Sequence, residues 1–290
     1  MPVIKSPLRY PGGKSKALQY IEKYLPTDFD EFREPFVGGG TLFIHIRQKY
    51  PDAHIWINDL NYELFSFWVC ARDQLSKLVA EVSKVKKNVH DGRKLFEELS
   101  SVDVNGLTQL ERAVRFFVLN RISFSGTVES GGYSEKAFHA RFTDSSIERL
   151  AALENIMRGV QVTHLDYREV IQSSEKKVFV FLDPPYYSAT NSRLYGRNGV
   201  LHTSFDHDSF AQEMSKCHAQ WLVTYDDSEK IRDNFRFAHQ LAWKLQYGMN
   251  NYKKSFAEKG NELIITNYAL INGEKILQPR LFEKRTGYRK

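Results

Sequence analysis

Residues 177–187 read KVFVFLDPPYY, an apolar run that ends in an acidic residue, two prolines and two tyrosines. A continuous apolar run is typical of a strand that is buried on both faces of a parallel sheet. Open α/β sheets bind their ligands at the carboxyl ends of such strands. The stretch therefore predicts a central strand that presents Asp183, Pro184 and Tyr186 at a ligand-binding edge.

Strand and helix patterns alternate on both sides of this stretch. Helical spacing is predicted over residues 41–50 and from Leu60 to Trp68. The predicted strands cover residues 31–37, 54–58, 160–166, 177–187 and 220–227, with a terminal antiparallel pair around 237–247 and 262–269. This alternation predicts an α/β protein whose sheet is mixed and mostly parallel, with helices on both faces.

The alternation stops between residues 74 and 155. Residues 74–99 and 111–124 are charged and helical in pattern, and residues 125–142 form a polar, glycine-containing stretch with basic and aromatic residues. We therefore predict an inserted, mainly helical domain over 74–155, within a main domain made of residues 1–73 and 156–290.

The overall composition excludes several classes of protein. The net charge of +6 favours an anionic partner, and residues 275–290 alone hold six Lys and Arg residues. Cys70 and Cys217 lie far apart without a C-x-x-C spacing, which disfavours a disulfide framework or a zinc site. The N-terminus lacks an apolar signal region, and no long apolar run follows, so we expect a cytoplasmic protein that binds no metal and no membrane.

The triplet Gly13-Lys14-Ser15 matches the end of a phosphate-binding loop. That motif needs a glycine five positions before the Gly-Lys pair, where this chain has Leu8. A nucleoside triphosphatase is therefore disfavoured.

The glycine cluster Gly38–Gly40 follows the first predicted strand and precedes a predicted helix. Asp59 ends the next strand 19 positions after Gly40, close to the roughly 20 expected when an acidic residue binds the ribose of a nucleotide. This arrangement predicts a ligand that contains adenosine.

Asp183, Pro184 and Tyr186 offer a carboxylate, a carbonyl without a neighbouring N–H group, and an aromatic face. This set suits an exocyclic amine whose N–H groups bond to Asp183 and Pro184 while Tyr186 stacks on the base. Such bonds localise the nitrogen lone pair, which then attacks a sulfonium methyl group in line. Cytosine C5 methylation needs a cysteine next to proline, and neither cysteine has that neighbour. An amine inside a duplex is reached by flipping the base out.

Five stretches, in this order, carry a resemblance to a known family: PLRYPGGK, EPFVGGGTLF, INDLN, FFVLNR and DPPYY. Together they resemble the Dam-like (D12 class) DNA adenine-N6 methyltransferases. The resemblance implies a Rossmann-like methyltransferase fold, S-adenosylmethionine as donor, S-adenosylhomocysteine as product, and an inserted target-recognition domain. It also implies a cofactor pocket lined by Tyr10, Lys14, Phe36, Gly38, Asp59, Asp166 and Asp183, with Asp59 on the ribose and Asp166 beside the adenine.

The insert departs from the family pattern. Ser125 stands where asparagine is usual, and no Asn-Val-Pro stretch follows, which disfavours a GATC target. Asn120 and Arg121 match and are expected either to contact the DNA backbone or to close a helix. Composition adds Lys136, His139 and Arg141 as expected DNA contacts, and residues 188–210 as a loop over the flipped base.

The sequence thus predicts a methyltransferase specific for adenine N6 in double-stranded DNA, acting as a monomer in a bacterial or phage-infected cell. A cognate restriction endonuclease is a possible partner. Cytosine-N4 methylation, RNA or protein-glutamine methylation, and a catalytically inactive DNA-binding module stay open as alternatives.

Overall fold

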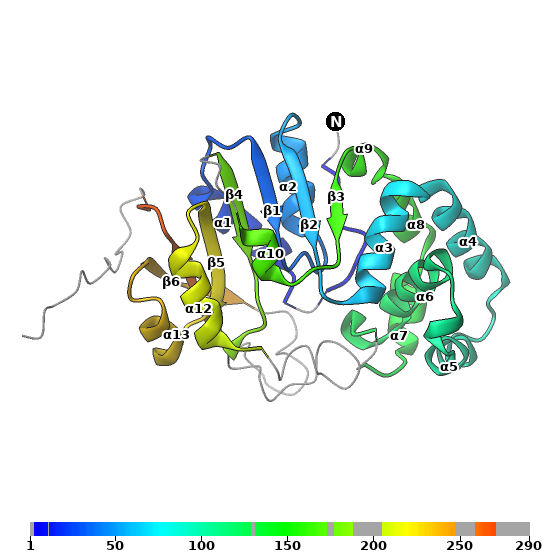
Figure 1. Ribbon diagram of the computed structural model, residues 1–290. Helices are drawn as coiled ribbons and strands as arrows, with labels where there is room; N and C mark the ends of the chain where they lie inside the picture. The colour runs from blue at the N-terminus through cyan, green and yellow to red at the C-terminus, as the bar shows by residue number, and fades with distance from the viewer. Residues whose placement is uncertain are drawn as a thin grey trace, which may run out of the picture.

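The computed structural model describes residues 3–10, 12–128, 131–172, 177–187, 205–246 and 259–270. In this part of the chain a seven-stranded sheet has the order β3-β2-β1-β4-β5-β7-β6 (Figure 1). The strands are β1 (Glu31–Glu34), β2 (His54–Asn58), β3 (Gln161–Thr163), β4 (Val178–Leu182), β5 (Gln220–Asp226), β6 (His239–Gln246) and β7 (Lys259–Thr266). Strands β1 to β5 pair in parallel, and β7 is antiparallel to both β5 and β6, so the predicted mixed sheet is confirmed.

Strand β4 lies in the middle of the sheet, and all five of its residues are buried. Phe179 and Phe181 join the apolar cluster on one face, and Val178, Val180 and Leu182 join the cluster on the other. Helices α2 (Thr41–Lys49) and α3 (Tyr62–Asp73) contribute to the first cluster, whereas α10 (Tyr167–Ile171), α12 (His207–Lys216) and α13 (Glu229–Asn234) contribute to the second. The short elements η1 (Lys14–Lys16), α1 (Leu18–Ile21) and η2 (Glu22–Tyr24) precede β1.

The predicted insert consists of helices in its described residues, apart from one isolated bridge between Ser123 and Tyr133. The elements are α4 (Leu75–Asn88), α5 (Gly92–Ser101), η3 (Val104–Gly106), α6 (Gln109–Ile122), η4 (Phe124–Gly126), α7 (Glu135–Arg141), α8 (Asp144–Ala151) and α9 (Glu154–Met157). They gather at the β3 end of the sheet (Figure 1). Residues of α4 and α6 belong to the same apolar cluster as strands β1 and β2, so the insert packs onto the main core.

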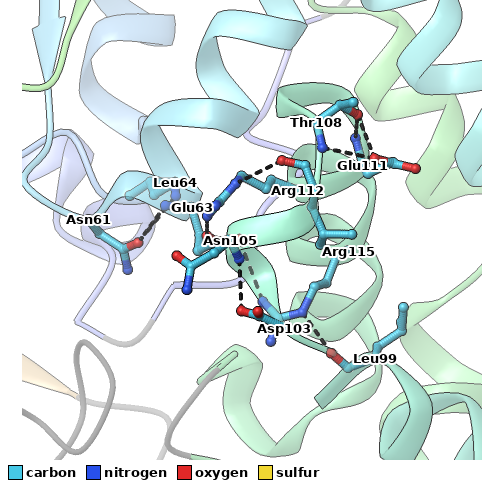
Figure 2. Close-up of polar contacts among 11 residues, drawn as sticks. Asn61, Glu63, Leu64, Leu99, Asp103, Asn105, Thr108, Glu111, Arg112 and Arg115 are labelled. Carbon is cyan, nitrogen blue, oxygen red and sulfur yellow. Dashed lines mark hydrogen bonds and ion pairs between the residues drawn. The ribbon is translucent and has the colours of Figure 1, made fainter. Parts of the chain in front are cut away.

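A buried ionic cluster fixes α6 to α3 (Figure 2). Glu63 of α3, which is 5% exposed, pairs with Arg112 of α6 and lies 3.5 Å from a terminal nitrogen of Arg115. Arg115 also donates to the carbonyl of Leu99 at 2.6 Å, and the Arg112 guanidinium lies 5.1 Å from the ring centre of Tyr62. Removing Glu63 would leave two largely buried guanidinium groups without their carboxylate, so this cluster ties the insert to α3.

The order in which strands are added to the sheet changes direction between β1 and β4, which run parallel. From β1 the sheet continues through β2 and β3 on one side, and through β4 and β5 on the other. Ligands of open α/β sheets bind at such a switch point, outside the carboxyl ends of the strands. Because β1 and β4 are neighbours, the segments that follow them, residues 35–40 and 183–187, lie side by side.

None of the helices within the described ranges has the length and apolar character needed to cross a membrane. Most of the expected loop over the flipped base, residues 188–204, and the basic residues 275–290 lie outside the described residues.

Candidate active site

The loop after β1 brings backbone close to an aromatic ring. Gly38 and Gly40 have φ angles of +46° and +68°, a backbone region that residues other than glycine rarely adopt. A Cβ on Gly38 would lie 2.9 Å from the Tyr10 ring, and one on Gly39 would lie 2.8 Å from the Tyr10 Cβ. Tyr10 thus packs directly on the glycine loop, and its predicted contact with a cofactor stays a prediction.

Asp59 ties the end of β2 to this loop. Its Oδ2 accepts from the Gly38 N–H at 3.0 Å, and its Oδ1 accepts from the Asn61 N–H at 2.9 Å. Burial raises the pKa of Asp59 to about 6. Each carboxylate oxygen can accept a second bond, so both remain capable of binding ribose hydroxyls.

Glu34, the last residue of β1, was not predicted as a site residue. It is 4% exposed, and its Oε2 accepts from the Phe43 N–H at 3.0 Å in the first turn of α2. Gly40 at the helix N-cap has no side chain for this task, so Glu34 supplies the acceptor instead. Burial and the nearby Asp183 and Asp59 raise its pKa well above the usual value.

Asp183 lies at the end of β4 within a buried polar cluster. Its Oδ1 is 2.7 Å from the Lys14 Nζ and accepts from the Thr224 hydroxyl of β5 at 2.8 Å. Lys14 is 5% exposed and also donates to the Gly12 carbonyl at 3.1 Å. Lys14 of the PGGK stretch therefore reaches the carboxylate predicted to be catalytic, and Thr224 is a neighbour that the sequence did not indicate.

Tyr186 extends this cluster to β7. Its hydroxyl accepts from Lys14 Nζ at 3.0 Å and donates to Glu262 Oε2 at 2.5 Å. Its ring lies 6.0 Å from that of Tyr225, and the neighbouring Pro184 is buried. The three predicted catalytic residues thus lie at one edge of the sheet, where Asp183 and Tyr186 both contact Lys14.

Phe36 and Asp166 follow β1 and β3 at the same edge, and both side chains contact neighbouring protein groups. Phe36 packs in an aromatic group with Tyr167 and Phe205, at 5.5 and 5.8 Å between ring centres. The Asp166 side chain is 43% exposed and caps α10 by accepting from the Arg168 N–H at 2.9 Å. Their predicted contacts with the cofactor stay predictions.

Asn120 and Arg121 are buried, at 0% and 3% exposure. The Asn120 amide donates to the carbonyls of Arg9 and Gly126 at 2.6 and 3.1 Å and accepts from the Arg9 N–H at 2.9 Å. Arg121 donates to the Pro7 carbonyl at 2.7 Å. These bonds hold residues 7–9 against α6, and such burial disfavours the predicted contact with the DNA backbone for both side chains.

Helix α7 carries the other predicted DNA contacts, Lys136, His139 and Arg141, all exposed. His139 lies 2.7 Å from Glu135 on the same helix. Beside α6, Phe124 is 57% exposed and precedes Ser125, whose φ is +55°. No local pattern distinguishes Phe124 in the sequence, because the exposure of one phenylalanine depends on the turn around it.

Comparison with known proteins agrees with this geometry. The model of the D12 class N6 adenine-specific DNA methyltransferases matches residues 10–249. The chain is 23% identical over 280 residues to the type II methyltransferase M1.LlaDCHI of Lactococcus lactis subsp. cremoris, covering 90% of this chain and 94% of the relative. It is 25% identical over 200 residues to the type II methyltransferase M.MjaIII of Methanocaldococcus jannaschii, covering 63% of this chain and 69% of the relative. It is 25% identical over 273 residues to M.CviBI of Paramecium bursaria Chlorella virus NC1A, covering 91% and 100%.

The matched range includes the glycine loop, the insert and the catalytic stretch, so the predicted resemblance is confirmed. The chain belongs to the D12 class N6 adenine-specific DNA methyltransferase family and methylates adenine in DNA at N6.

Proposed function

We propose that the chain transfers a methyl group from S-adenosylmethionine to the N6 amine of an adenine flipped out of double-stranded DNA. The observation that carries this proposal is the adjacency of the glycine loop after β1 and the Asp183–Tyr186 stretch after β4. A donor seated on the loop would have its methyl group beside the catalytic stretch.

The residues at this edge fit such a donor. The pocket is expected to be formed by Tyr10, Lys14, Phe36, Gly38, Asp59, Asp166 and Asp183. The carboxyl groups of Asp59, Asp183 and Glu262 lie at this edge, where Lys14 contacts Asp183 and lies near Glu262. This balance favours a cationic ligand, and the donor supplies a positively charged sulfonium methyl.

The amine would be activated by the chain itself. The Asp183 carboxylate and the Pro184 carbonyl would accept its two N–H bonds, which stabilises positive charge as the N–CH3 bond forms and the S–CH3 bond of the donor breaks. The methylated amine would then release one proton to water, and S-adenosylhomocysteine would be the leaving group. Tyr186 stacks on the base. Methyl transfer of this kind needs no metal ion, and none is proposed.

The insert is proposed to recognise DNA. Exposed Lys136, His139 and Arg141 on α7 supply positive charge for phosphates, and exposed Phe124 offers an apolar face for a base. The names of the relatives mark them as type II methyltransferases, so a cognate restriction endonuclease in a bacterial or virus-infected cell is proposed as a partner.

The test is methyl transfer from labelled S-adenosylmethionine to duplex DNA, followed by nucleoside analysis. We expect N6-methyladenine from the wild-type chain and no product from Asp183→Ala, which should still fold and bind the donor. Ordinary activity in that variant, or a wild-type chain that fails to bind the donor in calorimetry, would contradict the proposal.

A further inference from the structure

Glu262 is a buried carboxylate at the catalytic edge that belongs to none of the motifs above. It lies near the start of β7, where β7 runs antiparallel to β5 and pairs Glu262 with Asp226. The antiparallel direction brings the start of β7 beside the carboxyl end of β5, and hence to the edge that holds Asp183. Its exposure is 1%.

Its contacts lead back to the catalytic carboxylate. Glu262 Oε2 accepts from the Tyr186 hydroxyl at 2.5 Å, and that hydroxyl accepts from Lys14 Nζ at 3.0 Å. Lys14 Nζ in turn lies 2.7 Å from Asp183 Oδ1. Lys14 is thus held between two carboxylates, directly by Asp183 and through the Tyr186 hydroxyl by Glu262.

This arrangement poses a problem for the reaction, because the amine and Lys14 need the same carboxylate. Asp183 Oδ1 already receives bonds from Lys14 and Thr224. Oδ2 is then the oxygen that faces the amine, and the positive charge that develops on the amine shares the single negative charge of Asp183 with the buried ammonium of Lys14. A buried charge that is only partly compensated is unfavourable, so a second anion near Lys14 would stabilise this arrangement.

We propose that Glu262 is a positioning residue for methyl transfer: it orients Tyr186 through its hydroxyl and keeps Lys14 compensated while Asp183 binds the amine. This inference rests on the proposed role of Asp183. Glu262 acts through Tyr186 and Lys14 and does not touch the base or the donor.

The ionisation of Glu262 should be visible in the pH dependence of the transfer rate. Burial raises the pKa of Glu262 to about 7; Asp183 and Asp226 also raise it, while Lys14 and the bond from Tyr186 lower it. The role requires the charged form, which appears as the pH rises through that value. The transfer rate should therefore rise between about pH 6 and pH 8.

The variant Glu262→Gln keeps an acceptor for the Tyr186 hydroxyl but removes the charge. Single-turnover methylation of duplex DNA at saturating donor should be about tenfold slower than wild type at pH 8. The difference in rate between wild type and variant should shrink towards pH 6. In the variant, the rise of the rate near neutral pH should therefore disappear. The coupling should also appear in a double-mutant cycle with Lys14→Met, in which the two losses are not additive.

Glu63→Gln is a matched control, because Glu63 is a similarly buried carboxylate paired with arginines of α6. It should lower Tm yet keep the rising limb of the rate profile. A wild-type rate and profile in Glu262→Gln, or a loss that is equal at every pH, would overturn the inference. Failure of the proposed function looks different, because the wild-type chain itself would then bind no donor or form no N6-methyladenine.

Discussion

Thr224 illustrates how a single residue orients Asp183, the carboxylate proposed to be catalytic. Its side chain is fully buried, and its hydroxyl donates to Asp183 Oδ1 at 2.8 Å. Together with Lys14 it restricts the rotation of the carboxylate, so that an oxygen faces the site where the amine is expected. A catalytic group held in place in advance is more effective than one that must be ordered during the reaction.

We therefore expect Thr224→Val, which keeps the shape of the side chain, to lower the transfer rate about tenfold. The lost hydrogen bond should also reduce the free energy of unfolding by about 1 kcal/mol. Rates come from single-turnover methylation, and stabilities from denaturant unfolding.

Thr266→Val is the matched control for this change. Thr266 is equally buried, in β7, and donates to the Tyr268 carbonyl at 2.7 Å, away from Asp183. It should lose similar stability without the loss of rate. Equal rates in the two variants would rule out a positioning role for Thr224.

The sequence predicted the motif residues of the site but missed three of their partners. Glu34, Thr224 and Glu262 are polar residues of strands β1, β5 and β7, and each of these strands holds other polar residues as well. The local pattern therefore does not distinguish them or show what they contact. Only the strand order places them beside Asp183, and that order follows from long-range pairing that no local pattern encodes.

The N-terminal segment, residues 7–10 and 12–14, connects α6 of the insert to the edge of the sheet that holds Asp183. Residues 7–9 are held by Asn120 and Arg121 of α6, and Lys14 reaches Asp183. Between them, Tyr10 packs on the glycine loop. A change at α6 can therefore alter the cofactor pocket without touching DNA.

This role separates Asn120 from the exposed residues of α7. We expect Asn120→Ala to lower Tm and weaken donor binding while leaving the salt dependence of DNA binding unchanged. Lys136→Ala should leave Tm unchanged but lower the slope of log K against log salt by about 1, as loss of one phosphate contact does. Thermal melts, calorimetry and a salt titration of duplex binding distinguish the two. A reduced slope for Asn120→Ala would restore it as a direct DNA contact.

The elements themselves were largely predictable. The predicted strands 54–58 and 220–227 correspond to β2 (His54–Asn58) and β5 (Gln220–Asp226), because apolar runs bounded by polar residues are a strong local signal. The insert was predicted as helical for the same reason. The burial of Arg115 and Arg121 of α6 was not predicted, because a helical pattern does not show that backbone carbonyls will meet their side chains.

The acidic residues at the strand ends contrast with the positive net charge of the chain. The chain carries a net charge of +6, yet the ends of β1, β2 and β4 and the start of β7 bring Glu34, Asp59, Asp183 and Glu262 to one edge. A net positive charge favours binding to DNA, while an acidic pocket favours a positively charged sulfonium group over an anionic one. The fold thus separates recognition of the polymer from recognition of the cofactor.

The acidic pocket predicts that donor and product stabilise the folded chain by amounts whose difference depends on pH. The raised pKa values of Asp59, about 6, and Glu262, about 7, mean that the folded chain keeps protons that the unfolded chain has lost. Their contribution to stability is present below about pH 4 and is lost as the pH rises through 6 and 7. His207, whose pKa is lowered by burial, acts in the opposite direction near its usual value. A bound cation compensates the ionised carboxylates, whereas a neutral thioether does not.

We therefore expect S-adenosylmethionine to stabilise the chain increasingly, relative to S-adenosylhomocysteine, as the pH rises from 5 to 8. The two ligands differ by one methyl group and one positive charge, so contacts common to both cancel. An added charge interaction on the order of 1 kcal/mol would widen the difference in Tm by about 2–4 °C. Scanning calorimetry with each ligand at saturating concentration measures it. The double variant Asp59→Asn, Glu262→Gln should show a smaller widening, because two of the titrating carboxylates are gone. A difference that stays constant with pH in the wild-type chain would mean that these carboxylates do not sense the sulfonium charge.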